Sequence, residues 1–275
     1  MIPRIGVIGV FMLTTLCFAP AGRAQFSNLD DLGQEFAKQL KSHKTRTLAV
    51  ADFQTSGDAI AGQGHYFAQL LTNSIKHHGK KLEVKDHKKF DAALASAHIT
   101  PASLAVPEIS NIPGSNVLPE IVITGTISRD KENYLFSVSA RQVEDGRVLY
   151  SQNTSFRRTG FFDSLSEPFP PDVGQTIYTL GAKGSKVGVP NCIDCPAPTY
   201  NESARREKFQ GSVMFMAVIS PEGRVVGLQA TNLLGHGLDE KAFDVVKSWR
   251  LAPPQAADGT PVYVMVPIEV TFRLY

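Results

Sequence analysis

The chain has 275 residues, 43% of them hydrophobic, so it is long enough for one large domain or two ordinary ones with buried cores. Its 28 basic and 26 acidic residues leave a formal net charge of +2, which is too small to indicate nucleic-acid binding or an acidic substrate. A basic stretch at 76–89 contains three of the seven histidines, and we interpret it as a solvent-exposed surface.

The first 25 residues have the pattern of a secretory signal. Arg4 precedes an uncharged apolar core from Ile5 to Ala19, and the small residues Gly22 and Ala24 are spaced as a cleavage site. The apolar run is shorter than the roughly 20 residues that a membrane-spanning helix needs, so an uncleaved membrane anchor is the alternative. We therefore predict a signal peptide at 1–24 and an exported mature protein.

Residues 25–159 contain the first group of predicted elements. Apolar residues at helical spacing predict a short helix within 25–44. The segments "TRTLAVADF", "HYFAQLLTNSIKHHG", "KLEVKD" and "HKKFDAALASAHI" follow as strand, helix, strand and helix. Three longer strands then form a meander, with Asp145 and Gly146 in a hairpin turn. We predict an α/β layer domain at 45–159.

Two glycines in this region, Gly62 and Gly64, superficially resemble a phosphate-binding loop. No lysine followed by serine or threonine accompanies them, so we interpret the segment as a strand-to-helix turn.

Residues 160–199 lose periodicity and are rich in proline and glycine, which indicates a linker. Within it lie Cys192 and Cys195, which are the only cysteines left once the signal is removed. In an oxidising exported compartment we expect them to form a local disulfide. A zinc site would need two further ligands, and a thioredoxin-type pair would open a helix, whereas prolines surround this pair. We expect no metal site and no cofactor.

The last part of the chain, 200–275, reads as a short helix, two antiparallel strands around "PEGR", a second helix and a final strand. In the second helix Leu238, Ala242 and Val246 share one stripe, and Pro253 and Pro254 follow its end. The whole chain is therefore predicted to have an α+β fold.

The final strand lies within "PVYVMVPIEVTFRLY", residues 261–275. Its apolar residues alternate with the others at a period of two, as in a half-buried strand. Pro267 has no N–H to give to a ladder and therefore indicates an edge strand or a bulge. An edge leaves main-chain groups free for another chain, although most edge strands bind nothing.

Residues 196–275 also carry motifs in a familiar order. The strings "FQG", "PEGRV" and "GLDEKA", and a tryptophan ahead of a proline-containing loop, follow one another as in the C-terminal domain of TonB-type energy transducers, which this stretch resembles. The resemblance implies a periplasmic domain with a three-stranded antiparallel sheet and two helices at 200–275. It also implies capture of a short peptide from an outer-membrane receptor by strand addition.

This resemblance places partner binding on the last strand. The residues expected to contact the partner are Val262, Tyr263, Val264, Met265, Val266, Pro267, Glu269, Thr271 and Arg273.

The middle region, with "TLAVADF", "EIVITGTISRD" and "YLFSVSARQVEDGRVLYS", is similar to the N-terminal α/β domain of TolB and to CsgG-like or FlgO-like envelope proteins. This second resemblance implies envelope assembly or partner docking, with no catalytic residues to carry over.

The leading hypothesis is a periplasmic, non-enzymatic interaction protein of the TonB type. It is expected to bind an extended peptide of an outer-membrane receptor or another envelope protein, and energy-coupled transport is a further expectation. The alternative is an envelope-assembly scaffold without force transmission, because the signal looks cleavable and the long proline-rich spacer of a transducer is lacking. We expect no nucleic-acid partner, and membrane contact only if the N-terminal segment stays uncleaved.

An enzyme is a third hypothesis, and its candidate residues are His65, Asp52, His98, Asp239 and Glu240. No set of nucleophile, base and orienting group can be read from them. Asp239 and Glu240 are explained by the helix dipole, and Asp52 by the end of a strand.

Overall fold

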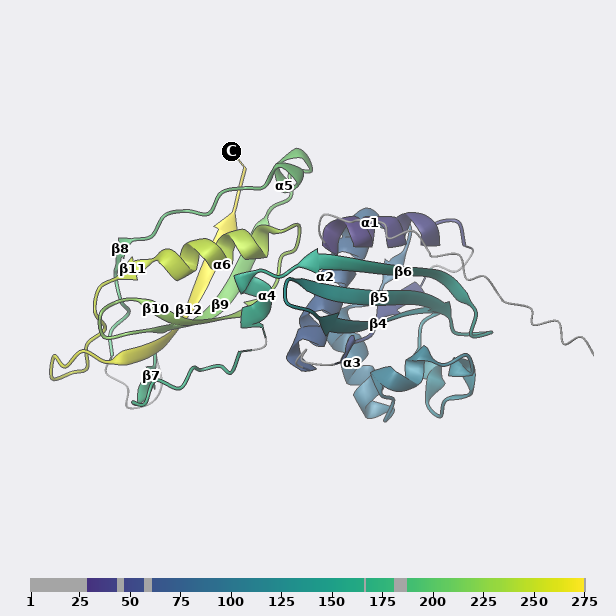
Figure 1. Ribbon diagram of the computed structural model, residues 1–275, viewed down its shortest axis with the longest axis horizontal. Helices are drawn as coiled ribbons and strands as arrows, with labels where there is room; N and C mark the ends of the chain where they lie inside the picture. The colour runs from purple at the N-terminus through teal and green to yellow at the C-terminus, as the bar shows by residue number, and fades with distance from the viewer. Residues whose placement is uncertain (1–28, 44–46, 57–60, 166, 181–186, 275) are drawn as a thin grey trace, which may run out of the picture.

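A computed structural model of the chain describes residues 29–43, 47–56, 61–165, 167–180 and 187–274. Two lobes lie side by side along the long axis of the molecule, each built on its own sheet (Figure 1). The predicted signal peptide at 1–24 lies outside the described residues. None of the helices in the described ranges has the length and apolar character needed to cross a bilayer.

The N-terminal lobe is built on a mixed sheet with strand order β3-β1-β4-β5-β6, in which β2 also pairs with β4. β1 pairs in parallel with β3 and β4, and β4, β5 and β6 form an antiparallel meander. The strands are β1 (Thr47–Val50), β2 (Gln54–Thr55), β3 (Glu83–Val84), β4 (Ile121–Arg129), β5 (Asn133–Gln142) and β6 (Val148–Arg157).

Helices cover both faces of this sheet, because the residues of β1 are apolar on both sides. Leu48 and Val50 belong to the main core, which also contains residues of α1 and α2, whereas Ala49 and Ala51 belong to a separate core with α3 and the 3₁₀ turns. The lobe therefore has three layers. The elements are α1 (Leu29–Leu40), α2 (Ala61–His78), α3 (His87–Ser96), η1 (Pro101–Ala105), η2 (Ile109–Asn111) and η3 (Ser115–Val117).

Gly64 explains how α2 approaches the end of β1 so closely. A Cβ at this position would lie 1.9 Å from the carbonyl oxygen of Phe53, so only glycine fits. The Phe53 N–H in turn donates to the Gly64 carbonyl at 3.3 Å. This contact fixes the first turns of α2 over the segment that follows β1.

The C-terminal lobe is built on a sheet with strand order β10-β9-β12-β7, and α6 packs across β9 and β10. Its core contains Phe215 of β9, Phe243 and Val246 of α6, and Val264 and Val266 of β12. The elements are β7 (Ile177–Thr179), β8 (Cys192–Asp194), α5 (Glu202–Arg206), β9 (Gly211–Ile219), β10 (Val225–Asn232), α6 (Leu238–Ser248), β11 (Arg250–Leu251) and β12 (Tyr263–Phe272). The predicted α+β class is confirmed, but the sheet has four strands where three were expected, because β7 joins it.

Helix α4 (Gly160–Ser164) joins the two lobes through adjacent aromatic side chains. Phe162 packs on Phe67 in the N-terminal lobe, with ring centroids 4.9 Å apart, and Phe161 packs on Phe243 of α6 at 5.6 Å. Both side chains are buried and belong to one continuous core that extends through both lobes. The start of the segment interpreted as a linker thus lies in the interface between the lobes (Figure 1).

Candidate functional site

The register in which the last strand, β12, pairs with β9 determines which residues of β12 direct their N–H and C=O groups away from β9. Pro267 lies opposite Met216. Because proline has no N–H, Pro267 and Met216 form a non-hydrogen-bonded pair of the antiparallel ladder. Successive residues of a strand direct their N–H and C=O groups to opposite sides. Met265, Glu269 and Thr271, at odd positions like Pro267, therefore direct their main-chain groups away from β9.

β7 occupies the first part of that outer side. It pairs in parallel with Tyr263–Met265, and the Leu180 N–H donates to the Met265 carbonyl at 3.1 Å. The next bond of a parallel ladder would need an N–H at residue 267, where proline has none. Pro267 therefore ends the pairing with β7.

The expectation of an edge along the whole last strand is thus corrected for Tyr263, Val264 and Met265, which have neighbouring strands on both sides. Val262 precedes β12 and donates its N–H to the Pro254 carbonyl at 2.9 Å. A three-residue strand in a segment without periodicity gives no sequence signal, so β7 was not expected.

The second half of β12 has no neighbour on this side within the described parts of the chain. We name the stretch from Pro267 to Arg273 the free edge. The side chains of Glu269, Thr271 and Arg273 are exposed, whereas Val266 belongs to the core. No described strand pairs with the main-chain groups that Glu269 and Thr271 direct away from β9.

A hollow of about 400 Å³ lies at the end of the free edge, lined by Ala197, Pro198, Tyr200, Thr271, Phe272 and Arg273. The Tyr200 ring contacts Phe272 edge to face, with centroids 5.4 Å apart. The Tyr200 hydroxyl is buried and has no hydrogen-bond partner among the described residues. It can therefore accept or donate one further hydrogen bond.

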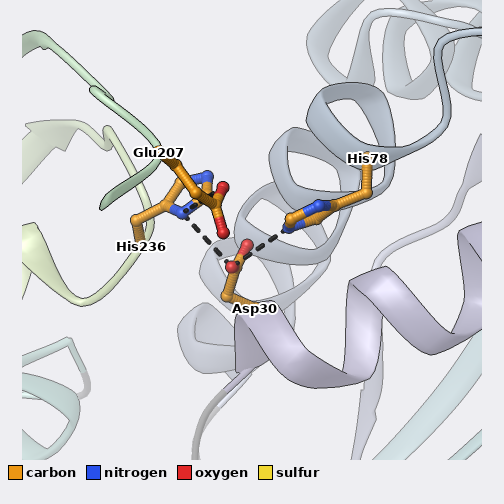
Figure 2. A group of neighbouring side chains, drawn as sticks. All are labelled: Asp30, His78, Glu207 and His236. Carbon is orange, nitrogen blue, oxygen red and sulfur yellow. Dashed lines mark hydrogen bonds and ion pairs between the residues drawn. The ribbon is translucent and has the colours of Figure 1, made fainter. Parts of the chain in front are cut away.

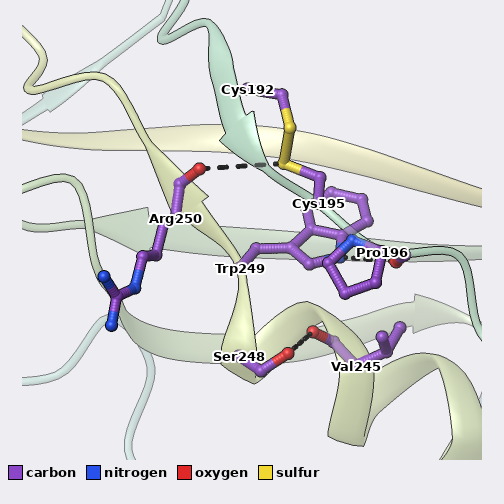
Figure 3. The surroundings of a disulfide bond; sticks show 7 residues. All are labelled: Cys192, Cys195, Pro196, Val245, Ser248, Trp249 and Arg250. Carbon is purple, nitrogen blue, oxygen red and sulfur yellow. Dashed lines mark hydrogen bonds between the residues drawn. A yellow bond between two sulfur atoms is a disulfide. The ribbon is translucent and has the colours of Figure 1, made fainter.

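Cys192 and Cys195 form a disulfide, as predicted (Figure 3). The short strand β8 that begins at Cys192 pairs with β11, directly after α6. The Trp249 indole N–H donates to the Pro196 carbonyl at 3.0 Å. The cysteine loop is therefore fixed against the residues that end α6.

A second group of polar side chains, Asp52, His65, His87 and Asp91, lies in the N-terminal lobe, and we name it the histidine–aspartate cluster. Asp52 follows β1, His65 lies on α2, and His87 and Asp91 are one turn apart on α3. His65 Nδ1 is 3.1 Å from Asp52 Oδ1, and His87 Nε2 is 2.9 Å from the same oxygen. The sequence analysis gave His65 and Asp52 as separate candidate residues and did not predict that they are in contact. It did not identify His87 and Asp91, although their spacing of four residues on a predicted helix places them on one face.

The pKa values in this cluster favour an ion pair. The hydrogen bond with Asp52 and the adjacent carboxylate of Asp91, 3.4 Å away, raise the pKa of His65 to about 10. Burial acts to raise the pKa of Asp52, but the close contacts with His65 and His87 outweigh it and lower this pKa. The two effects have one physical cause, because each partner stabilises the charged form of the other.

A third group, Asp30, His78, Glu207 and His236, lies between the two lobes, and we name it the interdomain cluster. Figure 2 shows His78 and His236 directed at Asp30 from opposite sides. His78 Nε2 and His236 Nδ1 lie 3.1 and 3.2 Å from Asp30 Oδ2, and His236 Nδ1 lies 3.8 Å from Glu207 Oε2. Burial lowers the pKa of His236. Both this cluster and the histidine–aspartate cluster have donor atoms close enough together to hold a metal ion.

The remaining enzyme candidates have other positions. His98 follows α3 with a left-handed backbone, φ 55°, and belongs to neither cluster. Asp239 is buried and accepts the N–H groups of Leu234 and Gly235, each at 2.7 Å, so it holds the turn before α6. Burial raises the pKa of Asp239 to about 7, against the effect of these two bonds.

The C-terminal lobe thus has the geometry of a small α+β domain whose last strand is free along half of one side. Residues 196–274, which include α5 to β12, match the family model described as Gram-negative bacterial TonB protein C-terminal. The resemblance seen in the sequence is confirmed for this part of the chain, and the matched class is one of protein-interaction domains of the cell envelope.

Several solved structures show a more distant likeness. The LpoB C-terminal domain from Salmonella enterica is 16% identical, with 48% of this chain and 99% of that chain covered and a TM-score of 0.36. Lipoprotein GNA1162 from Neisseria meningitidis is 11% identical, with 42% and 81% covered and a TM-score of 0.33. The Pseudomonas aeruginosa TonB CTD is 19% identical, with 36% and 96% covered and a TM-score of 0.28. These TM-scores are too low to establish a shared fold, and no curated protein sequence matches the chain.

Proposed function

We propose that the chain is an interaction protein of the cell envelope that binds an extended peptide by strand addition to the free edge. The observation that supports this proposal is that β7 pairs with β12 only up to Met265, before Pro267. Beyond Pro267, Glu269 and Thr271 direct their main-chain donors and acceptors away from β9. Backbone hydrogen bonds to an added strand supply affinity in this mode of recognition.

The size of the free edge limits the peptide. Pro267 to Arg273 extends over roughly 20 Å at about 3.3 Å per residue, which accommodates a strand of about six or seven residues. The exposed side chains of Glu269, Thr271 and Arg273 lie beside that strand and contribute specificity. The hollow next to Tyr200 is large enough to accept one peptide side chain.

The partner that we propose is the periplasmic peptide of an outer-membrane receptor or another envelope protein. The test is an NMR titration of the mature chain, 25–275, with a panel of such peptides. Binding peptides are expected to shift the amide signals of Glu269 and Thr271 more than those of Ile268 and Val270. A panel that binds without perturbing these amides would contradict strand addition at this edge.

A scaffold role without force transmission is the second candidate, and a specific observation favours it. A TonB-type transducer needs a long free spacer, but α4, β7 and β8, all within 160–199, are packed against the C-terminal lobe. Val187 is also buried in the core.

Mass spectrometry of the mature protein separates the two roles. A chain that starts at Gln25 has lost the predicted signal peptide, and with it the alternative of an inner-membrane anchor, and would act as a periplasmic scaffold. A chain that retains Met1 has kept the anchor that energy-coupled transport requires.

A further inference from the structure

The four donor atoms of the histidine–aspartate cluster all lie within 4.8 Å of one another, close enough to share one metal ion. His87 Nε2 is 2.9 Å from Asp52 Oδ1 and 3.3 Å from Asp91 Oδ2. His65 Nδ1 is 3.1 and 3.4 Å from the same two oxygens. Zinc bonds of about 2.0–2.1 Å place tetrahedral ligands roughly 3.3 Å apart. We propose that this cluster binds a divalent transition-metal ion, with Zn²⁺ favoured.

The orientation of His87 supports a metal rather than a simple ion pair. Its Nδ1 lies 2.9 Å from the Val50 carbonyl oxygen, which can only accept, so Nδ1 carries a proton. In the neutral ring the lone pair of Nε2 then points into the cluster. A backbone carbonyl that orients a histidine in this way is the usual outer contact of a metal ligand.

Two atoms of the cluster are buried without a hydrogen-bond partner among the described residues. They are His87 Nε2, on a side chain only 4% exposed, and Asp91 Oδ2. Two electron-pair donors held 3.3 Å apart in a buried site repel each other unless a proton or a cation lies between them.

The fold holds the ligands before any ion binds. Gly64 places α2 against the segment after β1, which brings His65 over Asp52. The Asp86 side chain caps the N-terminus of α3 by accepting the Lys89 N–H at 3.0 Å. The cluster is also reachable, because the His65 side chain is 44% exposed.

The ligand types indicate which ion fits. Imidazole suits zinc, copper and nickel, whereas carboxylate oxygens alone would favour magnesium or calcium. Two imidazoles and two carboxylates supply the four nitrogen and oxygen ligands that a four-coordinate zinc ion accepts. An ion there would fasten α2 and α3 to the end of β1. This proposal revises the expectation from the sequence that the chain has no metal site, and it does not depend on peptide binding.

The test is titration of chelator-treated full-length mature protein with Zn²⁺, followed by calorimetry, and with Co²⁺, followed by visible absorption. We expect one ion per chain and the intense d–d bands of tetrahedral cobalt. His65→Gln and Asp91→Asn each remove one ligand at a partly exposed position, and each is expected to weaken zinc binding at least about 100-fold. Circular dichroism of both variants checks that they stay folded.

His78→Gln is the matched control, because it removes a histidine from the interdomain cluster instead. This variant is expected to bind zinc like the unmodified protein. The proposal is overturned if the unmodified protein binds neither ion. It is equally overturned if H65Q and D91N bind zinc with unchanged affinity, or if H78Q alone loses the ion.

Discussion

Replacing Glu269 by proline tests the assignment of the free edge without knowledge of the partner. Glu269 lies two residues from Pro267 and directs its N–H to the same open side, so the change removes no bond of the ladder to β9. The free energy of unfolding of E269P should lie within about 1 kcal/mol of that of E269A, because no buried group loses a partner.

Ile268 provides the contrast, because its N–H belongs to the ladder. Ile268→Ala truncates a side chain that is 8% exposed and should cost about 2–5 kcal/mol. Ile268→Pro should cost a further 1–3 kcal/mol or so, since a carbonyl of β9 is left unsatisfied. Urea unfolding of the four variants measures both differences.

The same variants bear on peptide binding. E269P leaves Thr271 as the main-chain donor of the free edge, so a peptide that pairs with this edge should bind about 2- to 13-fold more weakly, the equivalent of one hydrogen bond. E269A keeps the N–H and separates this effect from loss of the carboxylate. A cost above about 3 kcal/mol for E269P, or equal stability of I268P and I268A, would refute the assigned directions of these groups.

Three further outcomes follow from the C-terminal lobe. Asp239→Asn removes a carboxyl group whose pKa is about 7 in the folded chain and near 3.8 in the unfolded chain. Between these pH values the native state binds more protons than the unfolded state, so the free energy of unfolding decreases as the pH rises. Urea unfolding at pH 5 and pH 8 should therefore show a larger loss of stability with rising pH for the unmodified protein than for D239N. Phe243→Ala should cost about 3–5 kcal/mol and loosen α4, because Phe243 is 1% exposed and contacts Phe161; equal hydrogen exchange of α4 in both proteins would argue against that coupling. Replacing Cys192 and Cys195 by serine should cost no more than about 2 kcal/mol by chemical denaturation, because the closed loop is so short, and a larger loss would mean that the disulfide holds more than its own loop.

The spacing of apolar residues along the sequence was sufficient to predict the helices and strands that bury one regular apolar face. The stripe of Leu238, Ala242 and Val246 predicted α6, and these residues are all buried. The alternation in 261–275 predicted β12, and the proximity of the cysteines predicted their bond. Each of these features is determined by residues close together in the sequence.

The features that the sequence did not reveal depend on contacts between distant segments. Ile177–Thr179 becomes a strand only because the outer side of β12 is available to it. Phe161 and Phe162 look like part of a linker, and their role appears only when both lobes are in place. The histidine–aspartate cluster combines a loop and two helices, so no single spacing along the chain could indicate it.

Under the proposed function, the short β7 competes with the peptide ligand for the outer side of β12. Three registered pairs hold it against Tyr263–Met265. A ligand that spans all of β12 must displace this segment, so its apparent affinity falls in proportion to the small fraction of molecules in which β7 is undocked. A ligand that starts beyond Pro267 would avoid that penalty, so strand addition at the free edge would select ligands by their length as well as by their sequence.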